Sequence, residues 1–164
     1  MITHLRGTMT FKCPTFVVLE AGGVGYQVFI SLHTYSQLPD TPTIFLLTHQ
    51  FIKEDSHTLY GFSEEKERAL FRLLISVSGV GPTTAQVLLS SISPDEIRLA
   101  ILSEQDEIFR KAKGIGPKTA KRIILDLKEK VLKVYNLDEV SVFESNTNKD
   151  EALSALEVLG FARK

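Results

Sequence analysis

The sequence contains the stretch Gly79-Val80-Gly81-Pro82-Thr83-Thr84-Ala85 and repeats it 35 residues later as Gly114-Ile115-Gly116-Pro117-Lys118-Thr119-Ala120. Both glycines, the proline, the second threonine and the alanine are identical in the two copies. Each copy lies between apolar stretches with helical spacing, and its proline stands where a helix can begin. The repeat therefore predicts two helix-hairpin-helix motifs in tandem; two ordinary connections between helices are the simpler alternative.

Turns of this kind are suited to binding an anion. The amides of a glycine turn, and those at the N-terminus of the following helix, can face outward and donate to a phosphate oxygen without reading a base. The candidate phosphate-binding residues are those of the two turns and the helix starts after them: Gly79, Val80, Gly81, Thr83, Thr84, Gly114, Ile115, Gly116, Lys118, Thr119, Lys121 and Arg122. Within this set we expect the backbone amides of Val80, Gly81, Ile115 and Gly116 to donate.

The distribution of charge supports a polyanionic partner. The whole chain has a formal net charge of −1, but the segment from Arg110 to Lys133 carries nine basic and two acidic side chains. Polyanions select such a local excess, although a solvated helix face can also carry one. Lys118, Lys121 and Arg122 are the side chains that we expect to supply charge next to the second turn.

The sequence of the first 63 residues is typical of β-strands. The segments Ile44 to Ile52 and Thr58 to Phe62 form a predicted hairpin whose tip is Lys53-Glu54-Asp55-Ser56. Five or six short strands, with one helical turn near His33 to Leu38, predict a small closed barrel. We therefore expect residues 1–63 to form one domain.

The remainder of the chain changes to helical spacing. Residues 64–135 are predicted to form the domain that carries both hairpins, with Ser63 as the first N-cap and Ser93-Pro94-Asp95-Glu96 as a capping box. Residues 136–149 are polar and acidic and are interpreted as a flexible linker, and residues 150–164 return to helical spacing. The expected fold class is thus α+β with several domains.

Several other functions find little support in the sequence. A nucleotide-binding P-loop needs glycine directly before its lysine, where this chain has Pro117, so we expect no ATP site. The four histidines and the single Cys13 lack metal-ligand spacing, so we expect no metal or cofactor. No nucleophile with a matching base is evident. The uncharged run from Ala21 to Pro39 is broken by Gln, Ser, Thr, His and Gly, so we do not expect it to cross a membrane. A nuclease or glycosylase, with Asp126 or Lys128 as its nearest candidate residues, and a barrel-centred single-strand binder remain as alternatives.

At this point the chain resembles the RuvA family, the subunits that recognise Holliday junctions in the bacterial branch migration complex. The motifs that carry the resemblance are both glycine hairpins together with Leu5-Arg6-Gly7, Gly22-Gly23-Val24-Gly25-Tyr26, Lys53-Glu54-Asp55 and Leu59-Tyr60-Gly61-Phe62. The family usually has a lysine soon after the first hairpin's proline, where this chain has Thr83. Its second hairpin often reads Gly-Lys-Lys-Thr, where this chain has Pro117-Lys118.

The resemblance implies a fold, a function and partners. The barrel would be of the oligonucleotide-binding (OB) type, and Glu54 and Asp55 would form an acidic pin at the centre of a homotetramer, or of two tetramers, around an open four-way junction. The chain would be a non-catalytic subunit of an ATP-dependent helicase complex in the cytoplasm, acting in recombination, DNA repair and the SOS response. Its partners would be the RuvB ATPase, contacted weakly by Leu153, Leu156 and Leu159, and the RuvC resolvase.

Overall fold

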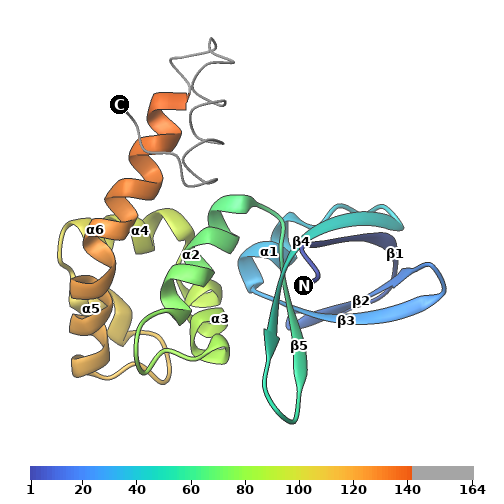
Figure 1. Cartoon of the computed structure of the whole chain (residues 1–164), viewed down its shortest axis with the longest axis horizontal. Coiled ribbons are helices and arrows are strands. Elements are labelled where there is room, and N and C mark those ends of the chain that lie inside the picture. Colours follow the sequence, from blue (N-terminus) through green and yellow to red (C-terminus); the bar gives the residue numbers. More distant parts are fainter. Residues whose placement is uncertain (142–164) are drawn as a thin grey trace, which may run out of the picture.

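A computed structural model of the chain describes residues 1–141. A strand-rich part and a helical part lie beside each other, and the chain passes from the first to the second between strand β5 and helix α2 (Figure 1). The α+β class expected from the sequence is therefore confirmed.

The strand-rich part is a closed five-stranded barrel. Its strands are β1 (His4–Lys12), β2 (Phe16–Ala21), β3 (Val24–Ile30), β4 (Thr43–Ile52) and β5 (His57–Phe62), and they close in the order β1-β2-β3-β5-β4. All neighbouring pairs are antiparallel except β3 with β5, which are separated in the chain by helix α1 (Leu32–Gln37) and β4. The predicted barrel, helical turn and β4–β5 hairpin are all present.

Alternation of side chains fills the inside of this barrel. Val17 and Leu19 of β2 and Val28 and Ile30 of β3 are at most 1% exposed, because residues two apart on a strand point to the same face. A Cβ on Gly7 would lie 2.2 Å from the carbonyl oxygen of Glu20, so β1 and β2 can approach this closely only where residue 7 is glycine.

The helical part packs five helices around one apolar core. They are α2 (Glu65–Ile75), α3 (Pro82–Ser91), α4 (Pro94–Leu102), α5 (Asp106–Arg110) and α6 (Pro117–Ser141). Tyr60 and Phe62 of β5 belong to the same buried cluster as the helices, and both rings contact Phe71 at centroid distances of 5.0 Å. The two parts therefore share a core.

Two of the predicted helix starts can be compared with the structure. Ser93 forms the capping box with Glu96, as predicted. Ser63 does not cap α2: the N-cap is Glu64, without a side-chain cap bond, and the Ser63 hydroxyl donates to Oε1 of Gln37. The Ser63 hydroxyl, which the sequence predicts as the cap of α2, instead bonds a side chain of α1.

Helix α6 also runs further than the sequence indicates. Residues 136–141, which we interpreted as the start of the acidic linker, continue the helix that begins at Pro117. No glycine or proline follows Pro117 in this helix, and extending an existing helix adds one hydrogen bond per residue without a new nucleation step. Along the described chain, no helix is long and apolar enough to cross a membrane.

Candidate nucleic-acid interface

The two glycine turns have the same backbone geometry. In the first, Gly79 has a φ of +90°, and the amide of Val80 donates to the carbonyl of Val77 at 3.0 Å. In the second, Gly114 has a φ of +95°, and the amide of Ile115 donates to the carbonyl of Ala112 at 3.3 Å. The sequence repeat is thus a structural repeat, and its first glycine is required because L-residues rarely adopt a positive φ.

The amides of Val80 and Ile115, which we expected to donate to phosphate, each make a hydrogen bond within their own turn. Each is engaged within its turn, and the two side chains are 4% and 6% exposed, so both residues anchor the turns to the core. Both residues thus have a packing role, and a phosphate contact at their amides stays a prediction.

The amides that remain available are those at the helix starts. The second glycines of the two repeats, Gly81 and Gly116, are exposed and directly precede the prolines of α3 and α6. The first amides of a helix have no acceptor within it, and Thr83, Thr84, Lys118 and Thr119 occupy such positions after the prolines. A Cβ on either Gly81 or Gly116 would meet nothing within 4 Å, so an approaching phosphate would find open space there.

Basic side chains surround the second turn. Lys118, Lys121 and Arg122 are all exposed at the start of α6. Nη1 of Arg122 donates to the carbonyl oxygen of Ser78, one residue before the first turn's glycine, at 3.4 Å. This bond places the two turns beside each other.

Thr83 occupies the corresponding position in the first repeat but makes a different contact. Its side chain lies near the hydroxyl of Tyr60 on β5, and burial raises the pKa of that hydroxyl. Thr83 therefore faces the barrel, and only the second hairpin presents a lysine at this position.

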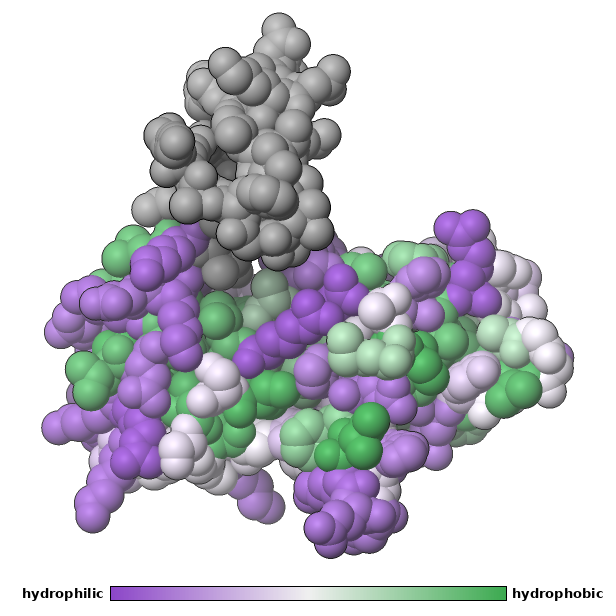
Figure 2. All heavy atoms as spheres, viewed as in Figure 1, coloured by the Kyte–Doolittle hydropathy of each residue, from purple (hydrophilic) through white to green (hydrophobic). Residues whose placement is uncertain are grey.

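The acidic tip lies on the same side of the molecule as the two turns. The residues from Lys53 to Ser56 are all exposed, and the amide of Lys53 donates to the carbonyl of Ser56 at 2.8 Å to close the tip. The β4–β5 hairpin and both helix-connecting turns point to the lower side of the view (Figure 1). Hydrophilic residues cover the tip and the lower left of the helical part (Figure 2).

Comparison with known proteins agrees with this geometry. Residues 1–61 match the family described as the RuvA N terminal domain, and residues 71–129 match the SAM-like helix-hairpin-helix tandem. Proteins named Holliday junction branch migration complex subunit RuvA from Christiangramia forsetii and Flavobacterium psychrophilum are 58% and 60% identical to this chain over 164 residues, covering 100% of it and 85% of each relative. The chain belongs to the RuvA family.

The same name is carried by a protein of Porphyromonas gingivalis, which is 44% identical over 171 residues, covering 99% of this chain and 85% of the relative.

In this RuvA-family chain, Leu153, Leu156 and Leu159, expected to contact the motor, lie outside the described residues. Across residues 1–141, no group of three or more histidine, cysteine, aspartate or glutamate side chains is arranged to hold a metal ion.

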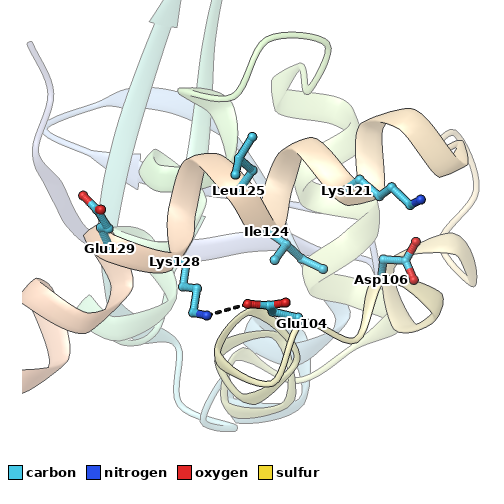
Figure 3. A pocket seen from close by; sticks show the side chains of 7 residues that line it. All are labelled: Glu104, Asp106, Lys121, Ile124, Leu125, Lys128 and Glu129. Atoms are coloured by element: carbon cyan, nitrogen blue, oxygen red, sulfur yellow. Dashed lines mark hydrogen bonds and ion pairs between the residues drawn. The ribbon is translucent and has the colours of Figure 1, made fainter.

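The candidate residues of a nuclease or glycosylase are not brought together. A cavity of about 470 Å³ lies between α6 and the turn after α4, and Lys128 lines it (Figure 3). Its Nζ is 2.5 Å from Oε1 of Glu104, and this bond lowers the pKa of the glutamate. Asp126 is exposed on α6 and does not line the cavity. Lys128 is therefore held in an ion pair with Glu104, and Asp126 lies outside this cavity.

Two further basic residues were not among the candidates named from the sequence. Lys111 and Lys113 are exposed directly before Gly114, and the nearby Arg110 is instead paired with Asp106 at 2.5 Å. Both lysines lie within the basic segment recognised from the sequence, so the sequence already indicated them as part of a charged region. Only the structure distinguishes them from the other basic residues of that segment, by showing that they are exposed beside the second turn.

Proposed function

We propose that this RuvA-family chain binds four-way junction DNA and holds it open for branch migration. The observation that carries the proposal is the placement of two glycine turns of equivalent backbone geometry and an acidic hairpin tip on one side of the molecule. The turns supply affinity for any duplex arm, and the tip supplies discrimination against DNA that lacks an opening.

The affinity for DNA comes from protein groups that contact only the sugar-phosphate backbone of the DNA. The amides of Gly81 and Gly116, two exposed residues that directly precede the positive ends of α3 and α6, can donate to phosphate oxygens. Lys118, Lys121 and Arg122 add charge, and binding releases counterions from the DNA. None of these contacts depends on the base, which suits a protein that follows a junction as it moves through any sequence.

Discrimination comes from repulsion. Glu54 and Asp55 are exposed at the tip of a hairpin that projects beyond the barrel. A continuous duplex lying across the tip would bring phosphates against these carboxylates, whereas an open junction leaves a gap at its centre. Specificity built by penalising the wrong partner is common at binding sites.

The assembly and its partners form the finer part of the proposal. Four copies around the crossover, or two such tetramers, would place one pair of turns on each DNA arm. The chain would supply no catalytic group and would direct the RuvB ATPase to the junction, with RuvC able to act on it, in the bacterial cytoplasm. The names of the relatives, which describe a subunit of a branch migration complex, support this division of labour.

The test is a comparison of binding to four-way, duplex and single-stranded DNA of equal length and matched sequence, with magnesium present. We expect the order junction, duplex, single strand, and no cleavage or base release. Equal affinity for junction and duplex would contradict the proposal. Preference for the single strand would instead favour binding by the barrel, and product formation would favour the nuclease or glycosylase.

A further inference from the structure

We propose that Glu67 is a positioning residue: it fixes the acidic tip relative to the two phosphate-binding turns and thereby sets the preference for junctions over duplex. The inference rests on the proposed function. Glu67 lies on α2, is 0% exposed, and accepts hydrogen bonds from Ser31 and Thr34, which belong neither to the tip nor to the turns. It acts through the joint between the barrel and the helical part.

Both oxygens of the Glu67 carboxylate are held by the barrel side of this joint. Oε1 accepts a hydrogen bond from the hydroxyl of Ser31, at the end of β3, and Oε2 accepts one from the hydroxyl of Thr34, on α1, at 2.5 Å. Ser31 and Thr34 are themselves buried, at 2% and 0% exposed. A carboxylate taken out of water is costly unless its oxygens are satisfied, so this one holds its two donors in place.

Backbone donors fix the direction of each hydroxyl in turn. The amide of Thr34 donates to Oγ of Ser31 at 3.0 Å, and the amide of Ser63 donates to Oγ1 of Thr34 at 3.3 Å. Each hydroxyl accepts a hydrogen bond from a backbone amide and donates one to the Glu67 carboxylate. The network therefore has one consistent arrangement of protons, which defines the distance and the angle between α1 and α2.

Three more side chains of α2 and α3 bind backbone groups at, or directly beside, the ends of barrel strands. Nε2 of Gln86 donates to the carbonyl of Ile30 at 2.7 Å, and Oγ of Ser90 accepts from the amide of Leu32 at 3.1 Å. Nη1 of Arg68 donates to the carbonyl of Thr3 at 2.8 Å. Glu67 differs from all three because it bonds side chains that are fully buried.

The joint lies directly on the path from the tip to the turns. Strand β5 begins at the acidic tip and ends at Phe62, and only Ser63 and Glu64 separate it from α2. The α2–α3 connection then carries Gly79. A rotation at the joint would swing the tip away from the crossover, and apolar contacts alone resist such sliding less well than directional hydrogen bonds do.

The experiment combines Glu67→Ala with the charge-removing tip variant Glu54→Gln/Asp55→Asn, in the full chain. Its measured quantity is the ratio of the duplex Kd to the junction Kd. We expect Glu67→Ala to lower this ratio by about threefold or more. If the two sites are coupled, neutralising the tip should then change the ratio much less in the Glu67→Ala background than in the wild type. An unchanged ratio in Glu67→Ala would overturn the proposal, and so would additive effects of the Glu67 and tip substitutions on that ratio.

A second variant guards against simple loss of folding. Glu67→Leu with Ser31→Ala and Thr34→Val replaces the network by apolar groups, an exchange that often preserves stability. This variant should remain folded and still lose junction preference. Retention of the wild-type preference by this variant would refute the role of Glu67 as firmly as retention by Glu67→Ala. Glu107→Ala, which removes an exposed carboxylate on α5, is the matched control and should leave the ratio unchanged.

A structural readout completes the test. Spin labels at Ser56→Cys and Lys113→Cys, both exposed, in a Cys13→Ser background, report the distance between the tip and the second turn. The distribution should be narrow in the parent and broader or displaced after loss of the network. An identical distribution would overturn the inference. If the unmodified protein itself showed no preference for junctions, the proposed function would fail instead, which distinguishes the two failures.

Discussion

Arg122 of the second hairpin donates from Nη1 to the carbonyl oxygen of Ser78 in the first hairpin, at 3.4 Å. The bond spans 44 residues of sequence and joins the loop before Gly79 to the helix after Gly116. A single side chain therefore helps to set the spacing between two turns that would grip one DNA backbone. This arrangement gives Arg122 two separable roles, as a charge and as a spacer.

Replacement of Arg122 separates these roles. Arg122→Lys keeps the charge but has no guanidinium fork, so we expect junction affinity to fall while its salt dependence stays as in the wild type. Arg122→Gln should weaken binding and also reduce the slope of log K against log salt by about 0.9 for each phosphate that is no longer neutralised. Titrations at several salt concentrations distinguish the two variants. Equal slopes for both would show that Arg122 does not bind a phosphate.

Lys118 and Lys121 are expected to act through charge alone. Changing both to Gln should flatten the salt dependence by about 0.9 for every phosphate that the two lysines neutralise in each subunit, whatever the sequence of the DNA arms. Lys66→Gln, an exposed lysine on α2, serves as the control and should change the slope little. A double variant with the wild-type slope would remove this basic face from the interface.

The two glycines of the second turn should respond differently to the same substitution. Gly114→Ala forces a positive φ on alanine and should destabilise the protein by about 1 kcal/mol or more. Gly116→Ala places a methyl group in open space, so stability should change little while DNA binding falls, because the methyl group occupies the path of the phosphate. Urea unfolding and junction binding measured on both proteins check this. Full binding by Gly116→Ala would exclude close approach at that glycine.

The acidic tip is expected to weaken all DNA binding, and duplex binding most. Glu54→Gln with Asp55→Asn keeps the shape of the hairpin and removes two charges. Exposed charge interactions contribute up to about 1 kcal/mol each, so removing two charges should raise duplex affinity by roughly thirtyfold at most, and junction affinity by less. Both affinities should be measured at two salt concentrations, since screening reduces the effect. A parallel rise for duplex and junction would reduce the tip to a solvated turn.

Glu67 should make stability depend on pH in a predictable direction. Burial raises the pKa of its carboxyl, opposed by the bonds from Ser31 and Thr34 and by the nearby His33, with Glu64 adding to the rise. A raised pKa in the folded state means stability that is complete below the unfolded pKa and is lost as pH rises through the folded one. Compared with Glu67→Gln, the wild type should therefore gain stability as pH falls from 7.5 towards 5.

The measurement is the difference in unfolding free energy between these two proteins at each pH. His49 has a pKa lowered by burial and by Arg72 and Arg68, so it destabilises the fold as pH falls, but it is present in both proteins and cancels. A difference that stays constant between pH 7.5 and 5 would show that Glu67 does not titrate there.

Much of this protein was determined by local sequence. The repeated glycine turns, the capping box at Ser93 and the alternation that builds the barrel depend on residues close together in the chain, whose backbone preferences act independently of distant partners. The requirement for glycine at residues 79 and 114 is of the same kind, since a positive φ is a property of one residue. The positions of the basic segment and of the acidic tip could likewise be predicted directly from the sequence.

Only the tertiary structure decided how these parts work together. Nothing local indicated that the amides of Val80 and Ile115 are used inside the turns, that Ser63 bonds Gln37 rather than capping α2, or that Arg122 reaches Ser78. Glu67 reads in the sequence as an ordinary first-turn acid and is buried only because α1 and the barrel cover it. Such bonds join groups far apart in sequence, and their formation depends on desolvation and geometry that exist only once the two parts of the molecule have packed together.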